Sequence, residues 1–378
     1  MKKENDVLIL DLNSTTPVYT AYFSDALNKV GFNSKIFGKK RVYETKHLDY
    51  LDFDYIENIF CISNKIKNNT LKKILEIVEY FINWLNVLFL SKKYKIIHIQ
   101  WLPLTKYFVL WDYLMVFLLL KINNNVYYTV HNVIPHNNKS KRIRNNYKKL
   151  YKLLPNLVVH TQSTKEKLNK DFNINENKIL VSAHGPIYHQ LKNDSISRKE
   201  KTVGIIGNIS KYKRIEDSIK AIKSLHNEGI DVNLIIAGSG PNKYVKKLNK
   251  LIKTTDLNSS VKIINRYLDI QEMLEWYQEI RGLLVTYEEI EMSGAVMTAL
   301  PLGTPVIAYD VGGLNEVIEN NYNGRLVKKG DIKGIANSIK WILDKDESEL
   351  SLNCKKSIEK FSWRDIAKSL KETYLANI

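Results

Sequence analysis

The residues of this sequence best suited to chemistry are three glycine-bearing turns, each of which follows an expected β-strand. They lie in residues 204–214, at 237–240 and at Ser293-Gly294. A glycine after a strand is usually only a turn, but a helix N-terminus offers free N–H groups and a partial positive charge, which hold phosphate. The first turn also carries lysines, above all Lys213, that could neutralise a diphosphate. Three such turns with a lysine cluster predict a site for a nucleoside diphosphate.

The same turns exclude two familiar nucleotide sites. None contains the Walker lysine loop, and none has the Gly-x-Gly-x-x-Gly spacing of dinucleotide-binding proteins. Among the histidines, His131 ends the expected strand 126–131, at the sheet edge where ligands collect. Two interpretations of His131 stay open here: a ligand contact, or a structural histidine that caps a loop. Because no two histidines have the helical spacing of metal ligands, we expect no metal and no cofactor.

Short β-strands alternate with amphipathic helices along the chain. The expected strands are 7–12, 35–37, 96–101, 126–131, 157–161, 178–182, 202–207, 232–238, 261–265, 282–286 and 305–309. This alternation implies βαβ units and parallel sheets. The fold class is therefore α/β, with two doubly wound, Rossmann-like domains that face each other across a cleft, where the carboxyl ends of the strands gather ligands.

The predicted domains are residues 1–189 and 203–360. Between them the polar segment 190–202 has no apolar period and is interpreted as a linker. Residues 361–378 begin with a capping-box pattern and form a last helix. This helix either crosses back to the N-terminal domain or remains a plain helix of the C-terminal domain.

The composition is that of a folded protein. The chain has 378 residues, which corresponds to about two domains at roughly 150 residues each. Hydrophobic residues make up 44% and charged residues 26%, which excludes a disordered chain. The two cysteines, Cys61 and Cys354, cannot form a disulfide framework or a zinc ribbon, and they favour a reducing compartment. With no signal-peptide pattern at the start, we expect a cytoplasmic protein.

The positive charge is distributed unevenly. The formal net charge is +17, of which residues 1–185 carry +13. A basic half suggests an anionic partner, such as nucleic acid, an acidic membrane surface or a phosphorylated substrate. A biased genome rich in Lys, Asn and Ile is the alternative explanation of the total. Nucleic acid is not the expected partner, because no stacking-aromatic motif and no known nucleic-acid module accompanies the bases.

Two expected helices, 71–90 and 107–121, are unusually apolar. No stretch reaches ~18 uncharged apolar residues, so no membrane-spanning helix is predicted. Helix 107–121 is either a buried core helix or a face for a membrane or a lipid-linked substrate. The basic run 139–149 favours the second interpretation, since a lysine near anionic lipid contributes ~1 kcal/mol. An anionic membrane surface is therefore a further predicted partner, and the protein is expected to be peripheral on its inner face.

The second half of the chain resembles a known family over residues 203–330. The segment 292–308 ends in a Gly-x-Pro-Val-Ile-Ala core, and residues 312–316 form a Gly-Gly-x-x-Glu turn that is followed by 323–327. Together these stretches resemble the C-terminal half of GT-B glycosyltransferases of the large family 4 type, the glycosyl transferases group 1. The first half resembles the family more loosely, in His131-Asn132 and in the loop from Ser14 to Pro17.

The resemblance implies transfer of a sugar from a nucleotide-diphosphate sugar to a saccharide or lipid-linked saccharide, usually with retention and without a metal. It implies a hexosyltransferase (EC 2.4) of surface polysaccharide or glycolipid synthesis, with the donor on the C-terminal domain. The implied donor-binding residues are Gly207, Asn208, Lys211, Lys213, Arg266, Tyr267, Ser293, Gly294 and Thr298. The implied acceptor side consists of Thr15, Thr16 and His131, and the implied catalytic residues are His131 and Lys213.

Two features depart from the family pattern. Many members carry two glutamates eight positions apart, where this chain has Ile290 and Thr298. Thr298 is too short to replace a bidentate carboxylate at the ribose. The arginine often found after the first glycine of the diphosphate loop is Asn208 here, and Lys211 is a candidate substitute. Ser293-Gly294 resembles a subset of the family that has Ser-Gly in place of the first glutamate.

Two other functions remain open on these residues. Loss of the paired glutamates is compatible with a non-catalytic GT-B subunit or scaffold that binds nucleotide sugar without transferring it. A nucleotide-sugar epimerase of the same fold is the third alternative, but it requires a carboxylate in the cleft, and none is evident in the sequence.

Overall fold

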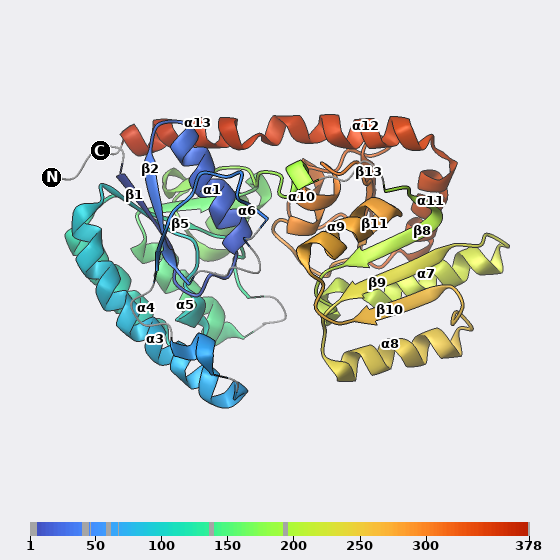
Figure 1. Cartoon of the computed structure of the whole chain (residues 1–378), viewed down its shortest axis with the longest axis horizontal. Coiled ribbons are helices and arrows are strands. Elements are labelled where there is room, and N and C mark those ends of the chain that lie inside the picture. The colour runs from blue at the N-terminus through green and yellow to red at the C-terminus, as the bar shows by residue number, and fades with distance from the viewer. Residues whose placement is uncertain are drawn as a thin grey trace. The chain divides into compact units, whose positions relative to one another are not determined.

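The computed structural model describes residues 6–39, 45, 47–57, 62–66, 68–135, 140–191 and 196–376. The chain divides into two compact units, whose elements Figure 1 labels and colours from blue at the N-terminus to red at the C-terminus. The first unit consists of Met1–Ala183 with Trp363–Ile378, and the second of His184–Ser362. Each unit is built on its own parallel sheet, so the predicted class of two doubly wound α/β domains is confirmed.

The first unit contains a seven-stranded sheet in the order β3-β2-β1-β4-β5-β6-β7. Its strands are β1 (Asp6–Asp11), β2 (Asn33–Gly38), β3 (Tyr55–Glu57), β4 (Ile96–Ile99), β5 (Val126–Thr129), β6 (Asn156–Val159) and β7 (Ile179–Val181). The central strands are buried along their whole length, as the continuous apolar runs of β1 and β5 require in a sheet covered on both faces.

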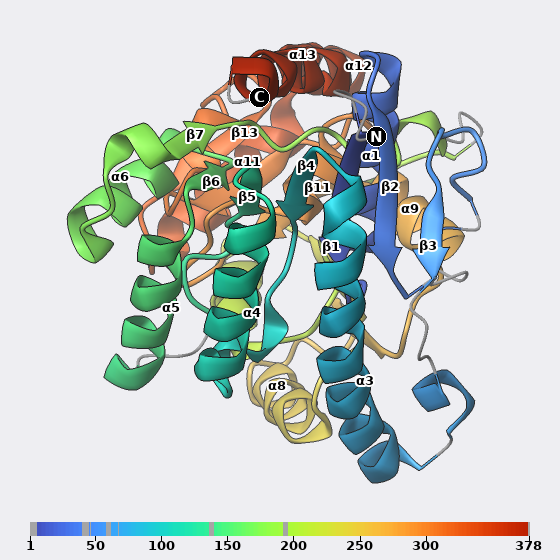
Figure 2. The same cartoon turned by 90° about the vertical axis from the view of Figure 1, so that its left-hand side faces the viewer.

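The helices of the first unit are α1 (Pro17–Lys29), α3 (Asn69–Leu90), α4 (Val109–Ile122), α5 (Lys141–Leu153), α6 (Gln162–Phe172) and α13 (Trp363–Ala376). Figure 2 shows α3, α4 and α5 side by side on one face of the sheet. Between them and the sheet lies the hydrophobic core, which includes Trp84, Val116 and Tyr151. The last helix, α13, belongs to this unit and packs on α1, where Trp363 stacks on Tyr22 with ring centroids 5.8 Å apart.

The second unit contains a six-stranded parallel sheet in the order β10-β9-β8-β11-β12-β13. Its strands are β8 (Lys199–Ile206), β9 (Asn233–Gly238), β10 (Val261–Asn265), β11 (Ile280–Val285), β12 (Val306–Tyr309) and β13 (Gly324–Val327). Its helices are α7 (Ile215–Asn227), α8 (Asn242–Thr254), α9 (Ile270–Glu279), α10 (Gly294–Ala299), α11 (Ile332–Asp344) and α12 (Glu347–Ile358). The core packs α7 and α11 against the sheet, with Ile219, Ile236 and Ile339 fully buried.

The predicted linker 190–202 is shorter in the structure than the sequence suggested. Residues 192–195 lie outside the described residues, and β8 already begins at Lys199. The first three residues of β8 are exposed and polar, so the sequence shows no apolar pattern there. Lys199 nevertheless already pairs with Ile280 of β11. The second unit also begins at His184, a few residues before the predicted boundary at 189.

The expectation that no helix could span a membrane does not hold on length and composition. Helix Thr70–Lys93 is long and apolar enough by these two measures, with 33% of its most apolar window buried. Between residues 77 and 91 its only charged side chain is Glu79. Helix α4, for which a buried core position was one interpretation, is buried only at Asp112, Met115, Val116 and Leu119.

Candidate functional site

The central cavity of the second unit lies where the strand order reverses. From β8 the chain first builds β9 and β10 on one side and then β11 to β13 on the other. At such a switch point the loops leave in opposite directions and open a crevice at the carboxyl ends of the strands. A cavity of about 290 Å³ lies there, next to Ile206 and Gly207 after β8 and to Tyr287 after β11.

The loop after β8 has a tightly determined backbone. Gly207 adopts a φ of +95°, which a residue with a side chain rarely adopts. The Gly207 amide donates to the carbonyl oxygen of Ala237 at 2.9 Å, and the Ile209 amide donates to that of Ser239 at 2.9 Å. A Cβ atom on Gly238 would lie 2.1 Å from the Gly207 carbonyl oxygen. The second glycine-bearing turn therefore supports the first one by close approach of the two backbones.

Lys213 is the buried cation of this cavity. Its side chain is only 4% exposed, and its Nζ donates to the Ile206 carbonyl oxygen at 3.2 Å and lies 5.3 Å from the centre of the Tyr287 ring. Burial lowers the pKa of Lys213 to about 8. In the described part of the chain its partners are a carbonyl oxygen and an aromatic ring, with no carboxylate among them, so its charge is available to an anionic ligand.

Arg214 holds the end of this loop in place. It adopts a left-handed backbone conformation directly before α7. Its guanidinium contacts the carboxylates of Asp217 at 2.6 Å and Glu288 at 2.7 Å, and Asp217 also accepts a hydrogen bond from Tyr309 at 2.8 Å. Because Glu288 belongs to the loop after β11, this ion-pair network joins the two loops that border the cavity and positions Lys213.

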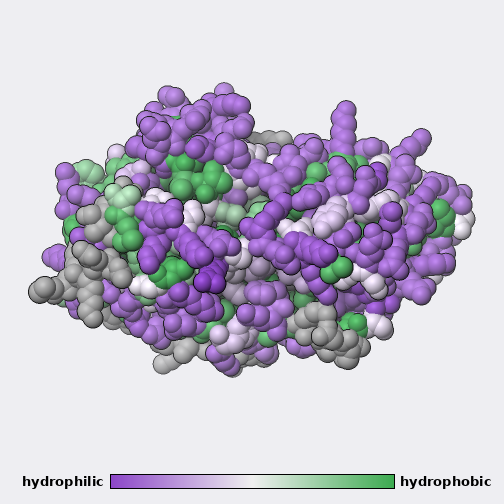
Figure 3. Space-filling model, turned by 90° about the horizontal axis from the view of Figure 1, so that it is seen from above, coloured by the Kyte–Doolittle hydropathy of each residue, from purple (hydrophilic) through white to green (hydrophobic). Residues whose placement is uncertain are grey.

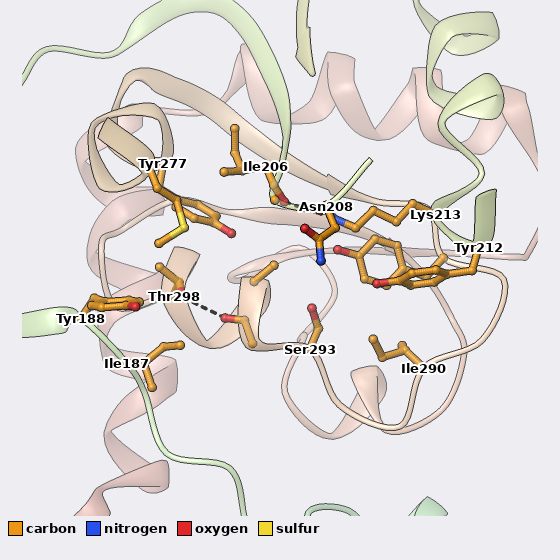
Figure 4. A pocket seen from close by; sticks show the side chains of 15 residues that line it. Ile187, Tyr188, Ile206, Asn208, Tyr212, Lys213, Tyr277, Ile290, Ser293 and Thr298 are labelled. Carbon is orange, nitrogen blue, oxygen red and sulfur yellow. Dashed lines mark hydrogen bonds between the residues drawn. The ribbon is translucent and has the colours of Figure 1, made fainter. Parts of the chain in front are cut away.

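The opposite wall of the cavity is the start of α10, as Figure 4 shows. Ser293 is the residue before the helix, and its side chain points toward Asn208 across the cavity. Thr298 also lines the cavity, but its hydroxyl donates to the Gly294 carbonyl oxygen of its own helix at 2.8 Å. The structure thus brings six predicted donor residues to one cavity: Gly207, Asn208, Lys213, Ser293, Gly294 and Thr298.

Aromatic residues that the sequence did not single out complete the lining. They are Tyr188, Tyr212, Tyr277 and Tyr287. Tyr188 has an unusual backbone φ of +60°, and the amide of its neighbour Ile187 donates to the Met297 carbonyl oxygen at 3.1 Å. Tyr212 stands between two lysines of the predicted phosphate loop, which is a signal that sequence reasoning could have used. Nothing in the sequence near Tyr188 or Tyr277 indicates a site.

Three predicted donor residues do not line this cavity. Lys211 is exposed on the loop. Arg266 and Tyr267 follow β10, an edge strand that β9 separates from β8. Arg266 is exposed and pairs with Glu272, with Nη1 to Oε2 at 2.6 Å, and Tyr267 is 66% exposed. Their assignment to the base of the nucleotide stays a prediction.

Two of the predicted acceptor residues, Thr15 and Thr16, follow β1 at the switch point of the first sheet, where β1 lies next to β4. The carboxylate of Asp11, at the end of β1, accepts hydrogen bonds from the amides of Thr15 at 2.8 Å and Thr16 at 3.2 Å. The Thr16 hydroxyl accepts a hydrogen bond from Trp101 Nε1 at 2.9 Å. Both backbone amides are therefore used to shape the loop, and the hydroxyl of Thr16 is used to hold Trp101.

His131 lies after β5 in a cluster of rings and hydrogen bonds. Its ring stacks on Trp101 with centroids 4.9 Å apart and an interplanar angle of 7°. Its Nδ1 lies 3.3 Å from His160 Nε2, and its Nε2 lies 2.9 Å from the side-chain oxygen Oε1 of Gln100, which can only accept a hydrogen bond. His131 is thus tied to its neighbours through both ring nitrogens.

His160 is held beside His131 by a hydrogen bond of its own. His160 Nδ1 lies 3.0 Å from the Ser182 carbonyl oxygen, which can only accept, so His160 Nδ1 is the donor. Burial lowers the pKa of His160 to about 4, so the ring is neutral near pH 7 and its Nε2 has a lone pair. This nitrogen lies 3.3 Å from His131 Nδ1, so the two rings are in direct contact. Sequence reasoning missed His160, although it follows the strand next to that of His131.

Comparison with known proteins finds a family match within the second unit. Residues 189–361 match the family described as Glycosyl transferases group 1. Among solved structures, HepE of Anabaena in complex with UDP and glucose has a TM-score of 0.72 at 16% identity and covers 99% of this chain and 100% of its own. TarM has a TM-score of 0.74 at 14% identity, with 98% and 99% covered. These likenesses show that the fold is GT-B.

Curated relatives match over part of their length. The N-acetyl-alpha-D-glucosaminyl L-malate synthase of Bacillus anthracis is 30% identical over 160 residues, which is 42% of this chain and 40% of the relative. The capsular polysaccharide biosynthesis glycosyltransferase CapM of Staphylococcus aureus is 27% identical over 241 residues, which is 58% and 60%. The chain therefore spans about half the length of the curated relatives it matches.

The cavity lies within the part of the chain that matches the glycosyl transferases group 1 family. The two positions at which many family members carry glutamates, Ile290 and Thr298, both line it. Neither side chain brings a carboxylate to the cavity, and the side chain of Glu288 pairs with Arg214 and Lys329 instead.

Proposed function

We propose that this protein transfers a sugar from a nucleotide-diphosphate sugar to a saccharide or lipid-linked saccharide acceptor. The observation that carries the proposal is the buried, carboxylate-free Lys213 at a cavity in the glycosyl transferases group 1 domain. An ammonium group that is held in a desolvated place at the expense of stability is typical of a functional site.

In the proposed reaction, the bond between the anomeric carbon and the diphosphate oxygen breaks and the acceptor oxygen takes its place. Negative charge develops on the leaving diphosphate, whose departing oxygen takes the proton that the acceptor hydroxyl loses. Lys213 and the backbone amides near Gly207 and Ser293 would stabilise that charge, and fixed donors in a site shielded from water do this more strongly than water does. The charge is then neutralised without a metal ion.

His131 would orient the hydroxyl groups of sugar and acceptor. Contacts at both ring nitrogens hold the His131 ring in position, and stacking on Trp101 restricts its rotation. Loss of orientation by about 1 Å is enough to lower a rate by about 100-fold. We propose retention at the anomeric carbon, and a place for this protein in hexose transfer for a surface polysaccharide or glycolipid on the cytoplasmic side. The name of CapM, which refers to capsular polysaccharide biosynthesis, supports that class of product.

A panel of nucleoside diphosphates and their sugars, measured by thermal shift and then by transfer to saccharide acceptors, tests the proposal. A ligand at about 100 times its dissociation constant stabilises the protein by about 2.7 kcal/mol. Uridine nucleotides come first, because HepE was solved with UDP. We expect one base to raise the melting temperature, and Lys213→Ala to lower transfer 10-fold or more. Wild-type transfer by Lys213→Ala would exclude the role of Lys213, and no response to any nucleotide would contradict the proposal.

A second function is favoured by one specific observation. Ile290 is apolar and the Thr298 hydroxyl is bonded within α10, at the two positions where many family members carry glutamates. A GT-B scaffold that binds nucleotide sugar without transferring it would fit these residues. Binding of a nucleotide sugar without transfer or hydrolysis, across a broad set of acceptors, would favour the scaffold over the enzyme.

A further inference from the structure

Helices α3 and α4 of the first unit have inverted polarity. Each contains a single charged residue over most of its length, Glu79 between residues 77 and 91 and Asp112 between 107 and 120. Both carboxylates are buried, while large apolar side chains of the same helices are exposed. A helix on the surface of a water-soluble domain normally has the opposite arrangement. The outward faces of α3 and α4 are therefore not adapted to water alone.

The buried carboxylates hold both helices firmly on the core. Glu79 accepts hydrogen bonds from Lys39 Nζ at 2.7 Å and from the Ser63 hydroxyl at 2.6 Å. Burial opposes its ionisation, yet these hydrogen bonds keep the pKa of Glu79 below its usual value. Asp112 accepts hydrogen bonds from the hydroxyls of Tyr80 and Thr105, each at 2.7 Å. Removing α3 from the core to span a membrane would break a buried ion pair, so the helix is built to remain on the sheet.

The outward apolar residues form one continuous stripe on each helix. The exposed residues of α3 recur at helical spacing, and they are Leu71, Ile74, Val78, Leu85 and Phe89. The exposed residues of α4 and the turn before it are Tyr107, Phe108, Leu110, Tyr113, Leu114 and Phe117. The two stripes meet at Phe81, whose ring lies 4.6 Å from that of Trp111 and 6.3 Å from that of Phe108. We name these eleven exposed residues the α3–α4 face.

Three lysines border the α3–α4 face, each above one of its aromatic rings. Lys93 lies 5.6 Å from the ring centre of Phe89, Lys106 lies 4.9 Å from that of Tyr107, and Lys121 lies 5.3 Å from that of Phe117. Next to α4 runs α5, which has six Lys and Arg residues and no acidic residue. An apolar surface with a basic border is complementary to a bilayer whose headgroups are anionic.

The position of this face in the fold agrees with contact to a flat surface. Figure 2 shows α3, α4 and α5 side by side on the outside of the first unit. Seen from the side that carries α13, by contrast, the surface consists mostly of hydrophilic side chains (Figure 3). Large exposed apolar patches on soluble domains usually mark an interaction site.

We propose that the α3–α4 face docks on an anionic membrane surface, with both helices parallel to the bilayer plane and the three lysines at the headgroups. The occupant is a lipid surface because the border is uniformly basic. A second copy of the chain would bring lysines against lysines, and like charges at an interface suppress association. The proposal does not depend on the proposed function, since it concerns binding to vesicles and needs no substrate.

Co-sedimentation of the full chain with preformed vesicles tests this proposal. Vesicles of phosphatidylcholine alone are compared with vesicles that contain phosphatidylglycerol, at low and at high salt. We expect binding to increase with phosphatidylglycerol and to weaken with salt, because the electrostatic part of the attraction is screened. Equal binding to both vesicle types, or none to either, would overturn the proposal.

Two sets of variants separate the apolar from the electrostatic contribution. In the first, Leu85, Phe89 and Leu110 are replaced by Asn; their side chains are 57%, 64% and 80% exposed, so folding is little affected. Loss of these side chains should weaken vesicle binding at least 10-fold. The matched control replaces Leu352 and Leu375, which are exposed on α12 and α13, and it should bind as the wild type does.

In the second set, Lys93, Lys106 and Lys121 are replaced by Gln. A lysine near anionic lipid changes the binding constant about fivefold, so the triple variant should bind about 100-fold more weakly. The control removes the same charge from α8, with Lys243, Lys246 and Lys250 replaced by Gln. This control should lose much less of its binding to anionic vesicles. Equal losses in both triple variants would mean that net charge rather than this face attracts the membrane. A dimer in solution that Leu110→Asn dissociates, without vesicle binding, would assign the face to a second copy and overturn the proposal.

Discussion

Replacement of Lys213 by methionine should make the ligand-free protein more stable while it removes nucleotide affinity. Methionine has nearly the same length but no charge, so the cavity shape is kept. Burial lowers the pKa of Lys213 from its ordinary value of 10.5 to about 8. One pKa unit corresponds to about 1.36 kcal/mol, so holding the ammonium group in this cavity costs about 3 kcal/mol at pH 7. Loss of the hydrogen bond from Lys213 to the Ile206 carbonyl oxygen offsets about 1 kcal/mol of the stability that the variant gains.

The net gain of about 2 kcal/mol corresponds to a rise of roughly 4–8 °C in the melting temperature of a unit of this size. The gain should depend on pH. Between about pH 8 and 10.5 the unfolded chain binds the Lys213 proton and the folded one has released it, so wild-type stability rises with pH in this window. The difference between Lys213→Met and wild type should therefore be largest below pH 8 and shrink toward pH 10.5.

Differential scanning fluorimetry at several pH values, with and without nucleotide sugar, measures both effects. A nucleotide sugar is preferable to a free diphosphate, because its phosphates do not titrate in this range. The reasoning predicts that wild-type affinity falls as the pH rises through about 8, where Lys213 loses its charge. A variant that is less stable than wild type at pH 7, by an amount that does not change up to pH 10.5, would refute the buried charge. A variant that keeps full nucleotide affinity would refute its role at the diphosphate.

Two further predictions concern the first unit. His160→Asn keeps a donor near Ser182 but removes the ring nitrogen that contacts His131 Nδ1 and holds the His131 ring in place; transfer should fall about 10-fold while the nucleotide thermal shift is unchanged, and loss of nucleotide binding would instead indicate general damage. Burial raises the pKa of Asp112 to about 6, so this carboxyl group holds its proton more tightly in the folded protein. The stability of the wild type should therefore fall as the pH rises from about 4 to 6. Asp112→Asn should remove this pH dependence of the unfolding free energy, measured by urea denaturation. An unchanged dependence on pH in the variant would contradict the prediction.

Most helices and strands of the fold were predictable, because buried strands alternate along the chain with amphipathic helices. The eleven expected strands are all present, with bounds that differ by a few residues. The sequence missed β3 (Tyr55–Glu57) and β13 (Gly324–Val327), which are short edge strands. An edge strand needs only one neighbour and a few buried side chains, so it leaves a weak pattern in the sequence.

The site was predictable where glycine is required for steric reasons. A Cβ atom on Gly238 would collide with the backbone of Gly207, and Gly207 itself adopts a positive φ that favours glycine. Lys213 stood out because of its lysine neighbours, yet only the fold shows that it is buried and that Lys211, two residues earlier, is exposed. The positions of Tyr188 and Tyr277 at the cavity and the contact of His160 with His131 depend on segments that are distant in sequence, so local patterns could not reveal them.

The sequence by itself determined the class of the protein: strands and helices in alternation, glycine turns that suit a diphosphate, and a basic first half. These properties are local, since they depend on residue type and spacing along one segment. Tertiary structure decided which side of each helix faces the core. Helix α4 is apolar on nearly all sides, so its sequence has no preferred face, and α3 carries a single charged residue between 77 and 91. Only the buried partners of Glu79 and Asp112 turn those carboxylates inward and leave Leu85, Phe89 and Leu110 on the surface.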